Sequence, residues 1–147
     1  MLDGNIFDML RTNSQDLELL ISKKEEVDLY ITRIQLNELC NIPDDKRSIR
    51  YENFEIAFKL QVQLISLSFF SFSYFSYSEC TYRFPKILQY VLKQSERNRE
   101  DAYIAESSAA YKFPLVTEDR ELLSKALSEK YVALNYREFI NEITGNP

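Results

Sequence analysis

The stretch KFPLVTEDRELL, residues 112–123, joins a short apolar run to a group of carboxylates. The apolar residues stop at Thr117, and Glu118, Asp119 and Glu121 follow at once. The run predicts a buried strand, and the helical periodicity that begins at Arg120 predicts a helix directly after it. The stretch alone does not explain why a strand would end in acids. The explanation depends on whether other parts of the chain bring acids to the same place.

The rest of the chain repeats this alternation of apolar runs and helical periodicity, which is typical of an α/β domain with a parallel sheet. The expected strands are residues 1–3, 27–32, 61–72, 114–117 and 131–134. The expected helices begin at Asn5 and at a Ser14 cap, and then cover 33–41 after a Thr32 cap, 51–59, 85–93, 98–111 after an Asn98 cap, 120–129 and 136–143. A length of 147 residues predicts one domain, 1–147.

Composition narrows the class of protein and its possible chemistry. The chain has no histidine, which excludes Ser-His-Asp and Cys-His catalysis, histidine bases and histidine-bound zinc. An enzyme with this sequence has to use carboxylates, hydroxyls, lysine or metal ions. Cys40 and Cys80 have no CxxC spacing and are interpreted as reduced, packed thiols of a cytoplasmic protein.

Two segments have more than one interpretation. Basic residues of the strip 83–99 are Arg83, Lys86, Lys93, Arg97 and Arg99, against a single acid. The strip is either a solvated helix face or a track for phosphates, although the net charge of −5 does not favour nucleic acid. Residues 60–78 carry no charge, but their glutamines and serines argue against a membrane span. Within them, SLSFFSFSYFSYS (66–78) predicts a half-buried strand, with base stacking as the alternative.

Two acids follow strand-like runs and two lie on helices. Asp3 and Asp119 would stand at the carboxyl ends of strands, where function collects in a parallel sheet. Taken singly, Asp3 is also explained as a turn residue and Asp119 as a first-turn acid favoured by the helix dipole. Glu118 and Glu121 are expected in the first turn of the helix that follows, where acids complement the dipole. Asp101, three residues after the Asn98 cap, is also explained by capping. Small residues behind it would let its helix approach the sheet; they are Ala102, Ala105, Ser108 and Ala109.

Glu38 lies between Ile34 and Ile42 on one helical stripe. A carboxylate among apolar side chains needs a cation, a donor or a route to water, because burial of an unpaired charge is costly. A metal ion is one such partner, and a glutamate at the edge of the stripe is the alternative. Oxygen ligands of this kind suit Mg²⁺ or Mn²⁺, which can activate water and stabilise phosphodiester oxygens.

Four motifs, in order along the chain, resemble those of the PIN domain family. They are MLDGNIF (1–7), ITRIQLNELCNIP (31–43), NREDAYIAESSA (98–109) and PLVTEDREL (114–122). Residues 51–95 match no motif of the family. One departure is Gly4, where the family usually has Ser or Thr, so a hydroxyl that could steady the site is absent.

The resemblance implies a three-layer α/β/α sandwich with a central parallel sheet, acting as a ribonuclease that depends on Mg²⁺ or Mn²⁺. The acidic positions of the family correspond to Asp3, Glu38, Asp101 and Asp119, and its supporting polar positions to Asn5 and Thr117. Many small members resemble the toxins of virulence-associated toxin–antitoxin pairs. From this we expect an RNA substrate, an antitoxin partner, a homodimer and no membrane association.

Two other classes of function are weighed against the nuclease. The first is a non-catalytic PIN-like module that acts as a binding scaffold in RNA processing; retention of all four acids favours the enzyme. The second is a phospho-acceptor receiver domain. That fold needs an acidic pair after its first strand and a lysine after a late one, and neither Asp3 nor Thr117 has such a neighbour.

Overall fold

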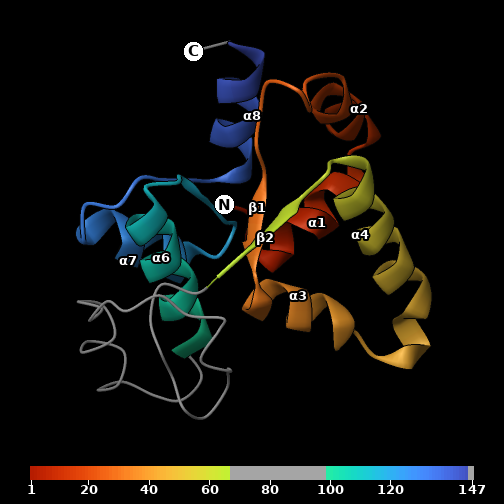
Figure 1. The fold of residues 1–147 in the computed structure, drawn as a ribbon, viewed down its shortest axis with the longest axis horizontal. Helices are drawn as coiled ribbons and strands as arrows, with labels where there is room; N and C mark the ends of the chain where they lie inside the picture. Colours follow the sequence, from red (N-terminus) through yellow and green to blue (C-terminus); the bar gives the residue numbers. More distant parts are fainter. Residues whose placement is uncertain (67–98, 146–147) are drawn as a thin grey trace.

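The computed structural model describes residues 1–66 and 99–145 (Figure 1). The fold is mixed α/β, with short parallel strands between longer helices. Helices are α1 (Gly4–Thr12), α2 (Ser14–Ser22), α3 (Arg33–Cys40), α4 (Arg47–Lys59), α6 (Arg99–Tyr111), α7 (Arg120–Ser128) and α8 (Tyr136–Thr144), with a 3₁₀ turn, η1, at Asp44–Lys46. Strands are β1 (Tyr30–Thr32), β2 (Gln63–Ile65), β3 (Leu115–Val116) and β4 (Ala133–Leu134).

The strands form two parallel pairs, β1 with β2 and β3 with β4. The segment Met1–Asp3 hydrogen bonds to both pairs. On one side, the Leu2 amide donates to the Tyr30 carbonyl at 2.8 Å. On the other, the Asp3 amide donates to the Val116 carbonyl at 2.9 Å, and Leu2 forms a parallel bridge with Val116. The chain start therefore connects the two sheets and ends, at Asp3, beside the end of β3.

The buried Gln35 side chain bridges the chain start and β1, because it hydrogen bonds to the Leu2 carbonyl and to the Thr32 amide. Its oxygen accepts hydrogen bonds from the Thr32 amide and hydroxyl, and its nitrogen donates to the Leu2 carbonyl at 3.1 Å. Gln35 is also the third residue of α3 and completes a capping box with Thr32. The same side chain thus starts α3 and holds β1 against the chain start.

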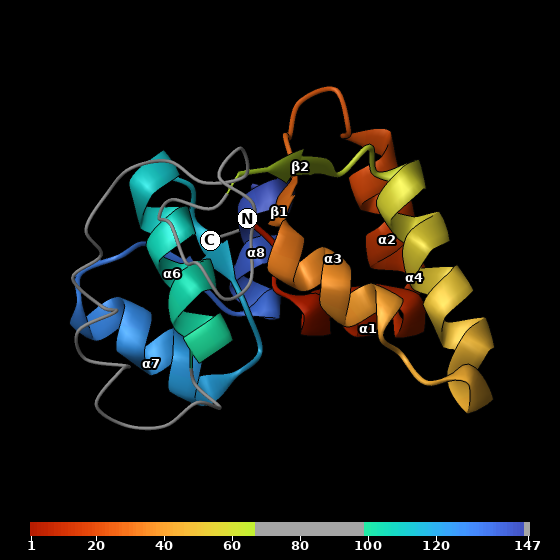
Figure 2. The same ribbon diagram turned by 60° about the horizontal axis from the view of Figure 1, so that its bottom comes forward.

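Hydrophobic residues pack on both faces of these strands. Met1 and Leu115 belong to a core cluster with residues of α6 and α7, whereas Leu2 and Val116 belong to a cluster with residues of α1, α2, α4 and α8. Neighbouring residues of a strand point to opposite faces, which explains the division. Figures 1 and 2 show α6 and α7 on one side of the strands and α1, α2 and α4 on the other.

Within the described residues the expected helices and strands exist, except that Met1–Asp3 forms only one bridge, at Leu2, and several limits differ. The strands are shorter than the runs that predicted them, and α4 starts at Arg47 instead of Tyr51. Ser14 does not cap α2, because the N-cap residue is Asn13 and Ser14 is the first helical residue. Cys40 is exposed, so its interpretation as a packed thiol is wrong. The reason is that Leu39, the residue before Cys40 in α3, lies on the buried face of the helix.

Some predictions fall on residues 67–98, outside the described part of the chain. They include most of the Ser/aromatic segment, Cys80, the helix 85–93 and the Asn98 cap. Over the described ranges, no helix combines the length and the apolar character that a membrane crossing requires.

We expect Gln35→Ala to lower the free energy of unfolding by about 3 kcal/mol, because it leaves buried groups of Leu2 and Thr32 without hydrogen-bond partners. Urea denaturation measures the change. The exposed Gln15 of α2 provides the control, and Gln15→Ala should stay within about 0.5 kcal/mol of the wild type. Equal losses in both variants would contradict the bridging role.

Candidate metal-binding carboxylate site

Asp3 is a buried carboxylate at the end of the chain-start segment, with 7% of its surface exposed. One oxygen, Oδ1, accepts from the Gly4 amide at 2.7 Å, so that Asp3 caps α1. The other, Oδ2, accepts from Asn5 Nδ2 at 2.8 Å and from the Thr117 hydroxyl at 2.6 Å. These three donors hold the carboxylate in one orientation.

Thr117 and Asn5 link Asp3 to the end of β3. The Thr117 hydroxyl donates to Asp3 and accepts from the Asp119 amide at 3.0 Å. The oxygen of Asn5 accepts from the Glu118 amide at 3.2 Å. The two supporting residues predicted from the sequence therefore join Asp3 to the turn that carries Asp119.

Asp119 follows β3 and caps α7. Its Oδ1 accepts from the amides of Glu121 and Leu122 at 2.8 and 3.0 Å. Capping of α7, a purely structural role, therefore accounts for Oδ1. Within the described residues, Oδ2 accepts no hydrogen bond, and the residue is exposed. Asp119 thus has one oxygen for the fold and one toward solvent.

Glu38 on α3 lies against the start of α1. A Cβ built on Gly4 would be 2.7 Å from Glu38 Oε2, which places this carboxylate next to the residue after Asp3. The side chain is exposed, however, so the expected burial within an apolar stripe is wrong. Ile34 is buried and Ile42 is only half-buried, which leaves the carboxylate at the edge of the stripe with a route to water.

Asp101 lies in the first turn of α6 and is half-buried. Ala102, Ala105 and Ser108 behind it are buried, each with 3% or less of its surface exposed. The prediction that small residues bring this helix close to its neighbours is therefore consistent with the packing. Close packing of α6 positions Asp101 near the other acids.

Electrostatic coupling connects the four acids. Burial, followed by the charges of Asp3, Glu100 and Asp101, raises the pKa of Glu38 to about 7. Burial, followed by the charges of Asp3 and Asp119, raises the pKa of Asp101 to about 6, although Lys125 lowers it. Glu38 as a whole residue is exposed, but its carboxyl group lies close to Gly4, so both partial loss of water and the neighbouring charges raise its pKa.

Burial also raises the pKa of Asp3, against the opposing effect of its hydrogen bonds from Thr117 and Gly4. The charge of Asp119 raises it further. Like charges that converge in this way favour protonation until a cation is present. The edge of the sheet therefore has an uncompensated negative charge.

The donor set fits a hard divalent cation. The candidate ligands are carboxylate oxygens, with Thr117 and Asn5 beside them, and such ligands suit Mg²⁺ or Mn²⁺. As placed in residues 1–66 and 99–145, no three or more acidic or cysteine side chains are close enough together to hold a metal ion. Coordination by all four acids thus requires a change of side-chain rotamers, which is open to the exposed Glu38 and Asp119.

Several residues near the site were missed or misassigned by the sequence analysis. Lys125 pairs with Glu121 at 2.6 Å, and its charge also acts on Asp101. Glu100, in the first turn of α6, adds a further negative charge. The expectation that Glu118 lies in the first turn of α7 is wrong. It precedes that helix, and its Oε1 accepts from the Tyr136 amide at 2.7 Å, at the start of α8.

The sequence did carry a signal for one of these residues. Lys125 lies four residues after Glu121, the spacing of an ion pair on a helix. No local pattern connects Glu118 with Tyr136, because their contact depends on how β3 and β4 pair.

The basic strip lies almost wholly outside the described residues. Arg83, Lys86, Lys93 and Arg97 belong to the part of the chain that the structure does not describe. Arg99 is the first residue of α6, and its side chain is not described. A role of the strip in RNA binding stays a prediction.

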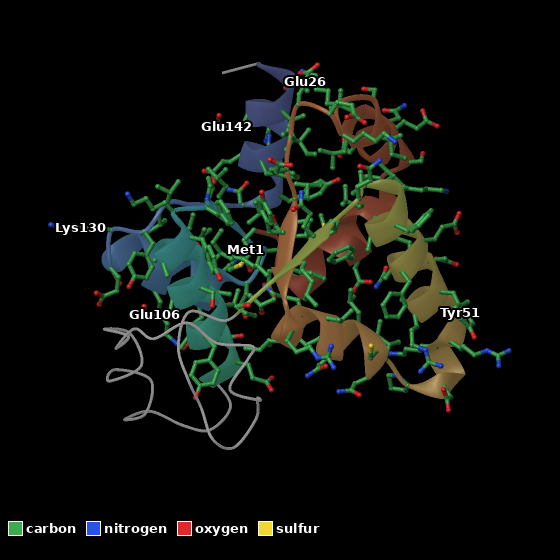
Figure 3. The ribbon with its side chains drawn as sticks, viewed as in Figure 1. Met1, Glu26, Tyr51, Glu106, Lys130 and Glu142 are labelled. Carbon is green, nitrogen blue, oxygen red and sulfur yellow. The ribbon has the colours of Figure 1, made fainter. Side chains whose placement is uncertain are left out.

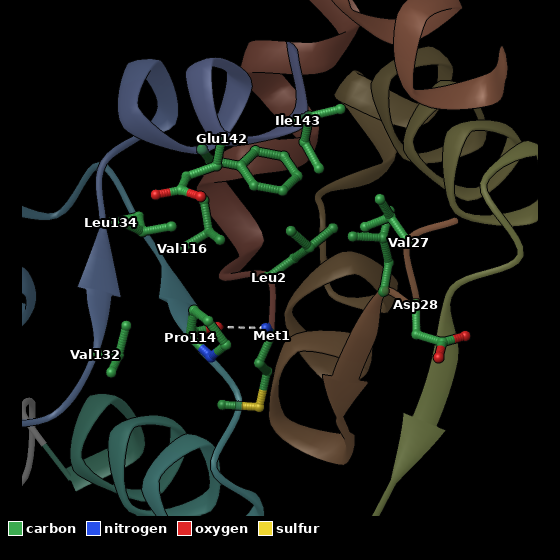
Figure 4. A pocket seen from close by; sticks show the side chains of 12 residues that line it. Met1, Leu2, Val27, Asp28, Pro114, Val116, Val132, Leu134, Glu142 and Ile143 are labelled. Atoms are coloured by element: carbon green, nitrogen blue, oxygen red, sulfur yellow. Dashed lines mark hydrogen bonds between the residues drawn. The ribbon is translucent and has the colours of Figure 1, made fainter. Parts of the chain in front are cut away.

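A separate pocket of about 350 Å³ lies between the chain start, the segment before β1, the strands β3 and β4, and α8 (Figure 4). Its walls are mostly apolar and include Met1, Leu29, Val116, Val132, Leu134 and Phe139. Two exposed acids, Asp28 and Glu142, also line it. None of the four candidate ligands lines this pocket, so it is separate from the carboxylate site.

Other exposed side chains lie away from both places. Tyr51 and Phe58 on α4 are 61% and 84% exposed, and Tyr51 points outward in Figure 3. The guanidinium of Arg47 lies over the Tyr51 ring, 5.9 Å from its centroid, and single exposed aromatic side chains are common in globular proteins.

Comparison with models of protein families, with curated proteins and with solved structures finds no match to this chain.

We expect Glu38 and Asp101 to contribute less to the stability of the metal-free protein as the pH rises from about 5 to 8. Their raised pKa values, about 7 instead of 4.5 for Glu38 and about 6 for Asp101, make the folded state bind more protons at these two groups than the unfolded chain does. Their part of the free energy of unfolding therefore falls as the pH rises, whereas the buried N-terminal amine, whose pKa burial lowers to about 5, contributes in the opposite direction. Thermal unfolding in EDTA across the pH range measures the slope.

Compared with the wild type, Glu38→Gln should lose less stability, or gain more, as the pH rises, and added Mn²⁺ should have the same effect on the wild type by neutralising the charge. Glu18→Gln, on the exposed face of α2, is the control and should have the pH dependence of the wild type. The same pH dependence in Glu38→Gln and the wild type would contradict the arrangement of charges.

Proposed function

We propose that this protein is an endoribonuclease that depends on Mg²⁺ or Mn²⁺ and cleaves RNA phosphodiesters. The proposal includes the finer fold that the sequence motifs imply, a PIN-like three-layer α/β/α sandwich with one central sheet. Helices on both sides of the strands support this fold, as does the way Met1–Asp3 connects the two parallel pairs.

One observation carries the proposal. Asp3 caps α1, Glu38 lies on α3, and Asp101 lies in the first turn of α6. These positions are far apart in the sequence, yet the charge of Asp3 raises the pKa of both other carboxyl groups. Mutual repulsion of this kind lowers stability, so four acids at one edge need a function. A cation that binds them would offset the repulsion.

The four acids have different roles in this proposal. Asp3, held by three donors, is the fixed ligand, and Asp119, Asp101 and Glu38 complete the set from three other elements. A divalent ion bound by them would activate water and stabilise the oxygens of the phosphodiester. Thr117 and Asn5 orient the Asp3 carboxylate and connect it to the Asp119 turn.

The substrate and partners follow from the same resemblance. We propose single-stranded RNA as the substrate, with the basic strip 83–99 in contact with its backbone. A toxin of a type II toxin–antitoxin pair, dimeric and silenced by an antitoxin, is the biological role that fits a small chain with these motifs.

A non-catalytic PIN-like scaffold is the second candidate. It is favoured by the finding that the described residues do not bring three carboxylates within coordination distance. Metal binding distinguishes the two candidates, because a scaffold has no need of a cation at these acids.

Asp119→Asn provides the most direct test of catalysis. Asparagine caps helices as well as aspartate does, so α7 and the fold should be retained. Loss of the charge should reduce Mg²⁺- or Mn²⁺-dependent cleavage of single-stranded RNA by more than about 100-fold, since even outer partners of a metal site are worth 10–100-fold. Circular dichroism verifies folding.

Glu118→Gln is the matched control. Glutamine can still accept the hydrogen bond from the Tyr136 amide, so both folding and cleavage should be close to the wild type. Full activity of Asp119→Asn, or cleavage that persists in EDTA, would refute the mechanism. Stabilisation of the wild type by Mn²⁺ without any cleavage would favour the scaffold.

A further inference from the structure

Gly4 lies between two of the four carboxylates. Its amide donates to Asp3 Oδ1 at 2.7 Å, and on its other side lies the carboxylate of Glu38. A Cβ built at this position would be 2.7 Å from Glu38 Oε2 and 3.8 Å from Glu38 Cδ. Apart from the chain neighbours and the backbone of α1, the described residues place no other heavy atom within 4 Å of it.

The backbone itself does not require glycine at position 4. Among the described glycines only Gly145 has a positive φ, and Gly4 is the first residue of a regular helix. Glycine is unfavourable in a helix compared with alanine, because it loses more conformational freedom on folding. The reason for glycine is therefore the space beside it, which the Glu38 carboxylate occupies.

We propose that Gly4 is a positioning residue, whose missing side chain lets the Glu38 carboxylate lie over the start of α1 beside Asp3. This inference rests on the proposed function for its consequence, namely that Glu38 and Asp3 bind a shared cation. Its steric part stands on the geometry alone. Contacts below 3.0 Å are essentially never made by a real Cβ, so any side chain at position 4 displaces the carboxylate.

The same geometry explains the departure from the motif at this position. A serine or threonine would bring its Cβ into the place of Glu38 Oε2, and the hydroxyl could be accommodated only after Glu38 had moved outward. In this chain the space of that side chain holds a carboxylate instead. Glu38 is free to move because its side chain is exposed and lies at the end of a flexible stem.

The test combines Gly4→Ala with two changes of Glu38. In the wild-type background, Gly4→Ala should weaken Mn²⁺ binding, measured by calorimetry, by about tenfold or more. In a Glu38→Asp background, the shorter side chain leaves room for a Cβ, so Gly4→Ala should weaken Mn²⁺ binding much less. In a Glu38→Ala background, where no carboxylate is left to displace, Gly4→Ala should have no further effect on Mn²⁺ binding.

Melting temperatures in EDTA separate this inference from the proposed function. Without metal, Gly4→Ala should raise the melting temperature in Glu38→Ala, because alanine is the better helix former, and should raise it more in the wild type, where the displaced Glu38 carboxylate also moves away from the charge of Asp3. The same change of melting temperature in both backgrounds would overturn the inference. If the wild type binds no Mn²⁺, the proposed function fails, and the EDTA comparison still decides whether Gly4 accommodates Glu38.

Discussion

The hydrogen bonds of the chain start, Met1–Asp3, are the contacts on which the rest of the structure depends. The segment has β1 on one side and β3 on the other, so it makes two separate strand pairs into neighbours. It also supplies Met1 to one core cluster and Leu2 to the other, one residue to each face. Its last residue, Asp3, is consequently held where β3 ends, by donors from Gly4 and Asn5 of α1 and from Thr117 after β3.

Helix starts compensate part of the charge that gathers at this edge. Asp3 caps α1, Asp119 caps α7 and Asp101 lies in the first turn of α6. The amides at a helix start carry partial positive charge, which favours an anion nearby. This compensation is incomplete, since the pKa of Asp101 is still raised to about 6. The remaining charge is what a divalent cation would neutralise, and it motivates the nuclease proposal.

The site also shows how a structural role and a functional role can share one side chain. The Oδ1 atom of Asp119 caps α7, which is a structural role. Its second oxygen is not needed for the cap. Gly4 has a comparable double role, because its amide binds Asp3 while its missing side chain accommodates Glu38. Substitutions that keep the cap but remove the charge can therefore separate folding from chemistry.

The sequence by itself determined the type and order of the elements that the structure describes, because apolar periodicity, the Thr32 cap and the strand-to-turn boundary at Thr117 are local properties of the chain. It also indicated which acids follow strands. The Thr-x-x-Gln spacing of residues 32–35 is typical of the capping box that Gln35 completes. Strand limits were less well determined, since a strand extends only as far as a neighbour pairs with it.

Only the tertiary structure decided the surroundings of each acid. Glu38 was expected within a buried stripe and is exposed, because the helix packs with Ile34 and Leu39 inward and turns its Glu38 edge to the start of α1. The roles of Gly4 and Glu118 likewise depend on partners more than ten residues away in the chain. Distances between elements are set by how their side chains pack together, and no local pattern encodes them.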